Sequence, residues 1–178
     1  MNTKTASPAR TKAVVRHGPR QEFAAEVDTL KVLAVVDNSE STNAVLRQVH
    51  ELSRNGSVDV LLLNVQPKPQ DWRLRGYQSF KRDEVEDRLI SDLGGKVVES
   101  AGRQLSAAGL MHRHRIELGE SAETILRCAR EENCDLIVIA EPPPRSLRRW
   151  LIRTCSIVIG SAASVVAQLS PVPVVVAK

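Results

Sequence analysis

Short apolar runs alternate along this chain with stretches of helical periodicity. The runs are the length of single strands and are rich in Val, Leu and Ile: Leu30–Val36, Val58–Val65, Cys134–Ala140 and Pro173–Ala177. A continuous apolar run is typical of a strand that is buried on both faces of a parallel sheet. The stretches between the runs carry apolar residues every three or four positions, as on the buried side of a helix. The alternation therefore predicts a three-layer α/β fold with right-handed crossovers between parallel strands.

A fifth strand is predicted at Met111–Leu118, where charged and apolar residues alternate. Alternation of this kind is typical of an exposed strand at the edge of a sheet. His112 and His114 share one face of this strand. No third ligand lies near them in the sequence, so we predict no metal site.

Four helices are predicted between the strands. They extend from residues 37–41 to about Arg54, from Lys81 to about Ala108, from Gly119 onward, and within Arg145–Leu169. Residues 37–41 are rich in N-cap residues, and Gly94-Gly95 interrupts the second helix. One face of the second helix is expected in the core, and it consists of Leu89, Leu93, Val97, Ala101 and Leu105.

The first 28 residues differ in composition from the rest of the chain. Residues 1–21 contain five basic residues and no acidic one, whereas the remainder holds 20 basic and 21 acidic residues. We therefore interpret residues 1–28 as a flexible basic tail and residues 29–178 as a single folded domain. Because the folded part is nearly neutral, its charge does not predict binding to nucleic acid.

Three further patterns exclude other classes of protein. Residues 154–177 are uncharged, but Pro171, Pro173 and Gln168 favour a buried helix followed by a strand over a membrane span. The three cysteines have no Cys-x-x-Cys spacing, which favours free thiols in a cytoplasmic protein. No nucleophile motif, phosphate-binding P-loop or paired His/Asp arrangement is present, so no catalytic residues are predicted.

Three segments of the chain resemble the universal stress protein family. They are VLAVVDNSESTNAVL, GESAETILRCAREENCDLIVIA and GSAASVVAQLSPVPVVV, and the likeness covers about residues 29–178. The resemblance implies an open five-stranded parallel sheet with strand order 3-2-1-4-5 and a homodimer formed through the C-terminal strand. It also implies that the chain is not an enzyme. Some members of the family bind ATP or AMP through a Gly-x2-Gly-x9-Gly-Ser/Thr motif after the fourth strand, and others do not.

Five residues match positions at which nucleotide-binding members of the family hold their ligand. Asp37 matches a carboxylate that faces the adenosine, and its alternative role is to cap the first helix. Val65 matches the second-strand position next to adenine, and its alternative role is in the core. Ala140 stands where the first glycine of the motif is expected. Gly160 and Ser161 match its last pair, and their alternative role is close packing of a helix.

The loop after Ala140 departs from the family motif. It reads Glu141-Pro142-Pro143-Pro144, and three prolines remove three N–H donors that a phosphate would need. Relative to the motif, seven residues are inserted before Gly160. Nearby arginines at positions 145, 148, 149 and 153 are candidates to bind phosphate instead, and the alternative is a solvated basic helix face.

These departures predict a non-enzymatic stress-response regulatory or protective protein that has no cofactor and does not bind ATP. The first alternative is a sensor that binds ATP or AMP. The second is an adaptor that binds a protein partner, nucleic acid or an anionic surface through the basic tail or the arginine cluster.

Overall fold

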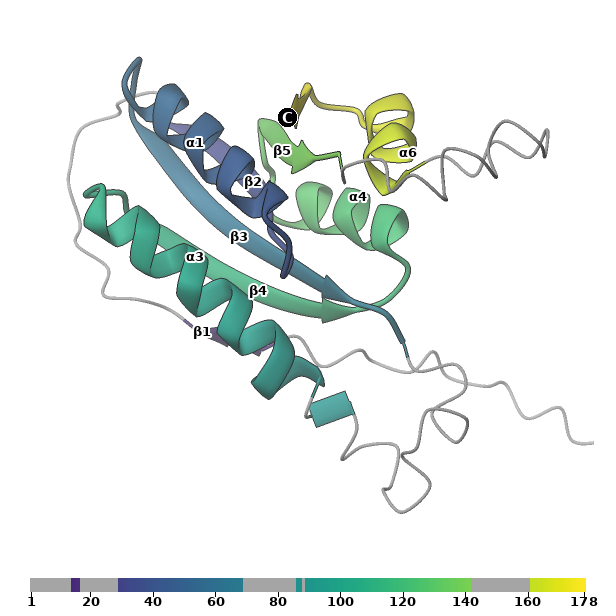
Figure 1. The fold of residues 1–178 in the computed structure, drawn as a ribbon. Coiled ribbons are helices and arrows are strands. Elements are labelled where there is room, and N and C mark those ends of the chain that lie inside the picture. Colours follow the sequence, from purple (N-terminus) through teal and green to yellow (C-terminus); the bar gives the residue numbers. More distant parts are fainter. Residues whose placement is uncertain (1–13, 17–28, 69–85, 88, 142–160) are drawn as a thin grey trace, which may run out of the picture.

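The computed structural model describes residues 14–16, 29–68, 86–87, 89–141 and 161–178 (Figure 1). Within these ranges the strands form one six-stranded sheet in the order β1-β4-β3-β2-β5-β6. The strands are β1 (Val14–Arg16), β2 (Leu30–Val35), β3 (Val58–Gln66), β4 (His112–Leu118), β5 (Leu136–Ala140) and β6 (Val174–Ala177). The last five are parallel and have the order 3-2-1-4-5, which confirms the predicted fold.

Helices cover both faces of this sheet. Helices α1 (Ser41–Ser53) and α3 (Gly95–Ala107) lie on one face, and α4 (Ser121–Glu131) and α6 (Ala162–Leu169) lie on the other (Figure 1). Alternate residues of the central strands face the two helical layers, so Val32 and Ala34 of β2 pack beneath α1 while Leu33 packs beneath α4. The apolar runs of β2, β3 and β5 are therefore buried on both sides, as their composition predicts.

The edge of the sheet differs from the prediction. The segment β1 pairs antiparallel with β4, with Val14 opposite Ile116 and Arg16 opposite His114, so β4 is not the outermost strand. The charges of β4 are not explained by exposure either, because Arg115 and Glu117 are 7% and 1% exposed and form ion pairs with α4. The other residues of the predicted tail lie outside the described ranges.

A π-helical turn precedes α3 and alters the predicted core face. Residues Leu89–Gly94 form a π-helix, and the regular α-helix begins at Gly95. Val97, Ala101 and Leu105 are buried as predicted, but Leu93 is 51% exposed. A π-turn contains more residues than an α-turn, so it rotates the residues before Gly95 away from the face that α3 buries.

The C-terminal part confirms a helix followed by a strand. Helix α6 ends at Leu169, and β6 pairs in parallel with β5 through Val174, which lies opposite Ile137. In the part of the chain that the structure describes, we find no helix with the length and apolar character needed to cross a bilayer.

Candidate functional site

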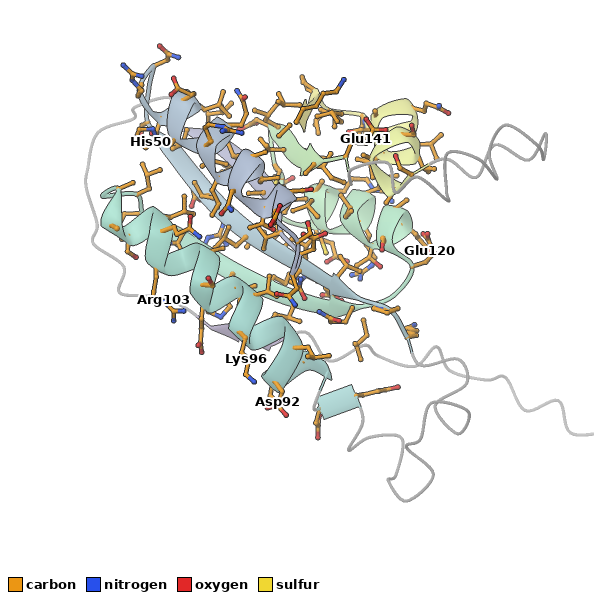
Figure 2. The ribbon with its side chains drawn as sticks, viewed as in Figure 1. His50, Asp92, Lys96, Arg103, Glu120 and Glu141 are labelled. Atoms are coloured by element: carbon orange, nitrogen blue, oxygen red, sulfur yellow. The ribbon has the colours of Figure 1, made fainter. Side chains whose placement is uncertain are left out.

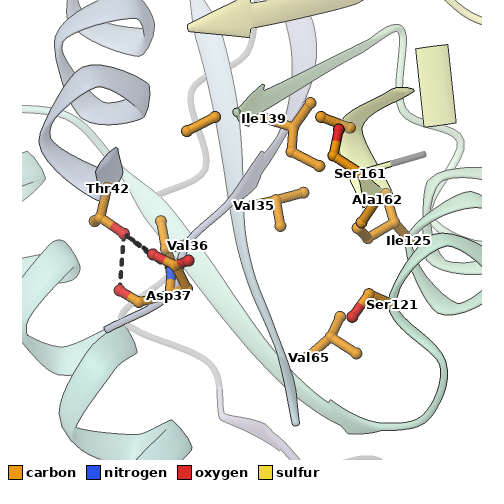
Figure 3. Close-up of a pocket in the computed structure, with 12 residues that line it drawn as sticks. Val35, Val36, Asp37, Thr42, Val65, Ser121, Ile125, Ile139, Ser161 and Ala162 are labelled. Atoms are coloured by element: carbon orange, nitrogen blue, oxygen red, sulfur yellow. Dashed lines mark hydrogen bonds between the residues drawn. The ribbon is translucent and has the colours of Figure 1, made fainter. Parts of the chain in front are cut away.

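A cavity of about 310 Å³ lies where the carboxyl ends of β2, β3 and β5 meet the amino ends of α4 and α6 (Figure 3). Its apolar wall consists of Val35, Val36, Val65, Ile125, Ile139, Ala140, Ala162 and Ala163. Its polar groups are Asp37, Thr42, Ser121 and Ser161. The chain leaves β2 toward β3 on one side and β5 toward β6 on the other. This is the switch point at which open α/β sheets bind ligands.

The structure brings four of the five predicted site residues together in this cavity. Asp37, Val65, Ala140 and Ser161 all line it, although they come from four separate elements of the chain. Gly160 lies outside the described residues, as do Pro142–Pro144 and the arginines at positions 145, 148, 149 and 153. The described residues therefore form the part of the predicted site that is expected to contact the nucleoside. The part expected to contact the phosphates lies outside the described ranges.

Asp37 follows β2 in a tight polar turn. Its Oδ1 accepts hydrogen bonds from the backbone N–H of Ser39 at 3.0 Å and from the Ser39 hydroxyl at 2.5 Å. Thr42 Oγ1 accepts from the N–H of Asp37 at 2.9 Å and lies 3.2 Å from Oδ1 (Figure 3). The N-cap residue of α1 is Glu40, which makes no capping side-chain bond, so the alternative prediction that Asp37 caps this helix is wrong.

Ser161 has a structural role that the sequence analysis missed. It is the N-cap of α6, and its hydroxyl oxygen accepts a hydrogen bond from the N–H of Ser164 at 3.2 Å. A hydroxyl that accepts this bond still has its own proton to donate. Ser161 therefore caps the amino end of α6 and also offers a hydrogen-bond donor beside the cavity.

Val65 and Ala140 form part of the apolar wall. Val65 lies near the end of β3, is half-buried and packs against the core between the sheet and α4. Ala140 is the last residue of β5 and pairs with Ala177 of β6. Val65 packs against the core and also borders the cavity, so its predicted core role is confirmed, while its place next to adenine stays a prediction.

Thr42 and Ser121 complete the polar lining but were not predicted as site residues. Thr42 is five residues beyond Asp37 and is the second residue of α1. Ser121 follows Glu120, whose carboxylate caps α4 by accepting from the N–H of Glu123 at 3.0 Å. Glu120 itself points outward at the end of α4 (Figure 2). The sequence signal that could have found them is their position after a strand: Thr42 comes six residues after the predicted strand Leu30–Val36, and Ser121 comes three residues after the predicted strand Met111–Leu118.

Asp37 carries the one formal charge among the described residues that line the cavity. Lys96 and Arg103 point outward from α3 (Figure 2), and Lys96 lines a second hollow that shares Asp37 and Thr42 with this cavity. No cluster of three or more metal-ligating side chains exists within the described ranges. The cavity thus offers an acceptor, several hydroxyl groups and a large apolar surface.

Two cysteine thiols in the described part of the chain are unreactive near neutral pH. Cys128 and Cys134 are free and buried. Burial raises the pKa of each thiol to about 11, so both are protonated near neutral pH. Neither thiol lines the cavity. Cys155 lies outside the described residues.

Comparison with known protein families identifies the fold. The model of the universal stress protein family matches residues 29–178. The chain belongs to the universal stress protein family. No curated protein sequence shows significant similarity to it.

Solved structures support this assignment at the level of fold. The hypothetical protein MJ0577 has a TM-score of 0.65 and 24% identity, over 84% of this chain and 95% of that one. UspA from Lactobacillus plantarum has a TM-score of 0.60 and 20% identity, over 84% and 97% of the two chains. A universal stress protein from Archaeoglobus fulgidus in complex with dAMP has a TM-score of 0.55 and 20% identity, over 84% and 98%.

Proposed function

We propose that this universal stress protein is a non-enzymatic, cytoplasmic regulatory or protective protein whose cavity binds the nucleoside part of an adenine nucleotide. We also propose that the protein does not bind ATP in the way that family members with the glycine motif do. The observation that carries it is the cavity itself, in which Asp37, Val65, Ala140 and Ser161 converge. Binding of the nucleoside would change the surface that the protein presents to other components of the stress response.

The size and lining of the cavity suit a nucleoside. Its volume of about 310 Å³ is at the lower end of the range for small-molecule sites. The side chains of Val35, Val65 and Ile139 offer an apolar wall for a base. Asp37 Oδ1 is occupied by Ser39, whereas Oδ2 accepts no hydrogen bond from any described residue. That oxygen is available to a hydroxyl or amino group of the ligand.

The chain beyond β5 argues against tight binding of a triphosphate. Ala140 is followed by the carboxylate of Glu141, which repels phosphate, and then by three prolines that lack N–H groups. The positions that carry the first two glycines in nucleotide-binding relatives hold Ala140 and Pro143 here. We therefore expect phosphate groups to add little affinity beyond that of adenosine.

A homodimer is part of the proposal. Strand β6 is the last strand at its end of the described sheet, and Val174, Val175 and Val176 are only half-buried. A second copy that pairs along this strand would cover them. Light scattering at increasing protein concentration should give a dimer, and Val175→Lys should shift the equilibrium toward the monomer.

Calorimetric titration with adenosine, AMP and Mg-ATP tests the ligand. We expect adenosine and AMP to bind with a Kd of about 10 μM, equivalent to roughly 7 kcal/mol, and Mg-ATP to bind no more tightly. Asp37→Ala should weaken adenosine binding by about tenfold or more, because it removes a charged acceptor. ATP incubated with the protein should remain unhydrolysed.

The outcomes separate the proposal from its competitors. Binding of Mg-ATP that is much tighter than that of adenosine would favour the sensor in which arginines bind the phosphates. A lack of heat with all three ligands, in protein free of copurified nucleotide, would leave a regulatory protein that acts through its surface alone. Binding unaffected by Asp37→Ala would place the ligand elsewhere.

A further inference from the structure

The carboxylate of Asp37 is held by its neighbours although the residue is exposed. Ser39 donates twice to Oδ1, through its backbone N–H at 3.0 Å and its hydroxyl at 2.5 Å. Thr42 Oγ1 lies 3.2 Å from the same oxygen and 2.8 Å from the backbone carbonyl of Asp37. An exposed aspartate without such bonds would exchange among several rotamers. These contacts select one of them.

Thr42 also fixes the backbone of the turn. Its hydroxyl oxygen accepts from the N–H of Asp37 at 2.9 Å, while its one proton is donated to the backbone carbonyl of Asp37 at 2.8 Å, with Oδ1 as the longer contact at 3.2 Å. Thr42 belongs to α1, whose packing on the sheet buries Val45 and Val49 completely. The turn is thereby tied to a rigid helix rather than left to move on its own.

A buried amide secures the strand end immediately before the turn. Asn64 of β3 is 1% exposed, and its Nδ2 donates to the carbonyl of Val36 at 2.8 Å. Its oxygen accepts from Gln66 Nε2 at 2.7 Å. Because both ends of the short segment from Val36 to Thr42 are fixed, the direction of the Asp37 side chain is determined by Ser39 and Thr42.

We infer that Ser39 and Thr42 are positioning residues that hold Asp37 in one rotamer, with Oδ1 saturated and Oδ2 left as the single acceptor for the ligand. The inference rests on the proposed binding of a nucleoside in this cavity. Holding the carboxylate in advance lowers the entropy lost on binding, since a rotamer-rich side chain no longer has to be ordered by the ligand. A saturated Oδ1 also limits Asp37 to a hydrogen bond through one oxygen, rather than a bidentate contact with a ribose diol.

A mutant cycle with adenosine as the probe tests this role. We expect Thr42→Val to weaken the affinity for adenosine about tenfold and Ser39→Ala to weaken it severalfold, while Thr42→Ser restores the affinity of the original protein. In the Asp37→Ala background, Thr42→Val should cause no further loss, because its effect passes through the carboxylate. Thr29→Val, at the opposite end of β2, is the matched control and should leave binding unchanged.

A direct role of Thr42 gives a different result. The side chain of Thr42 also lines the cavity, so a contact with the ligand would weaken binding equally with and without Asp37. That outcome, or full affinity in the Thr42→Val variant, would overturn the inference. Thermal unfolding of each variant separates a loss of affinity from a loss of folded protein.

A measurement without ligand keeps the inference separate from the proposed function. Three-bond NMR couplings of Asp37 report the population of its χ1 rotamers. We expect a single rotamer in the original protein and averaging in the Ser39→Ala/Thr42→Val double variant. Rotamer averaging in the original protein would refute the positioning role whether or not adenosine binds. A single rotamer together with no binding of adenosine would refute the proposed ligand and leave the restraint on Asp37 intact.

Discussion

Replacing Arg115 tests whether the buried ion pairs of β4 hold α4 to the sheet. Its guanidinium donates to Glu117 at 2.7 Å, to Glu131 at 2.7 Å and to Glu132 at 3.1 Å. Burial by itself would lower the pKa of Arg115, but hydrogen bonds with Glu117 and Glu131 outweigh it and raise the pKa. The side chain is therefore charged at every pH at which the protein is folded, and it links one strand to the end of one helix.

The cost of Arg115→Met follows from the burial of its partner. Glu117 is 1% exposed and would retain only the contact at 3.0 Å with Arg127 among its charged neighbours in the described structure. Removing one member of a buried pair costs about 3–5 kcal/mol where the remaining charge is left uncompensated. Because Arg127 still pairs with Glu117, we expect a cost near the lower end, about 3 kcal/mol. For a protein of this size each kcal/mol lowers Tm by roughly 2–4 °C, so we expect a fall of about 6–12 °C.

Arg113 provides the matched control on the same strand. Its pairs with Asp59 at 3.3 Å and Glu132 at 3.2 Å are more exposed, with side-chain exposures of 34%, 37% and 22% for the three residues. Arg113→Met should cost no more than about 1 kcal/mol. Urea and thermal unfolding of both variants measure the difference, and adding Glu117→Gln to Arg115→Met should recover part of the loss. Equal losses for the two single variants would refute the reasoning.

Three further outcomes follow from the structure. Burial alone would raise the pKa of Glu131, but hydrogen bonds from Arg127 and Arg115 outweigh it and lower the pKa. The contribution of Glu131 to stability is therefore present above the ordinary Glu pKa of about 4.3 and is lost as the pH falls below it. Urea titrations from pH 7 to 3 should show a smaller loss of stability in Glu131→Gln. Gly94→Ala should destabilise by about 1–3 kcal/mol, because a Cβ there lies 2.6 Å from Ile116 Cγ2, whereas Gly95→Ala has 3.7 Å of clearance and should be neutral or stabilising in chemical denaturation. Cys128 should resist iodoacetamide at pH 7.5 in the native protein and react in urea, as peptide mass spectrometry would detect, because burial raises its pKa to about 11.

The central strands of the sheet were predictable because β2, β3 and β5 are buried on both faces. Burial on two sides requires a continuous apolar run, and such a run is visible in the sequence without knowledge of its neighbours. Leu30–Val35 and Leu136–Ala140 are examples, and their residues are divided between the two helical layers in alternation. The predicted strand order came from the family resemblance, since composition alone does not fix it.

Other features depend on contacts that the sequence does not reveal. An arginine in a sequence does not reveal whether water or carboxylates surround it. Arg115 is paired with three carboxylates, but its charge was interpreted as a sign that β4 is an exposed edge strand. Leu93 fits a four-residue repeat, but a single π-turn changes the phase of that repeat and exposes it. The pairing of Val14–Arg16 with β4 rests on three residues, too few to give a periodic signal.

The cavity and the phosphate motif are separable properties of this fold. Asp37, Val65 and Ala140 reach the cavity because they end or follow neighbouring parallel strands, and parallel strands place their carboxyl ends at one edge of the sheet. The glycines of the family motif are expected instead at positions from Ala140 onward, most of which lie outside the described residues. The described cavity is formed without them. Under the proposed function, their replacement changes which part of a nucleotide is recognised, and the affinity of adenosine relative to Mg-ATP is the quantity that measures it.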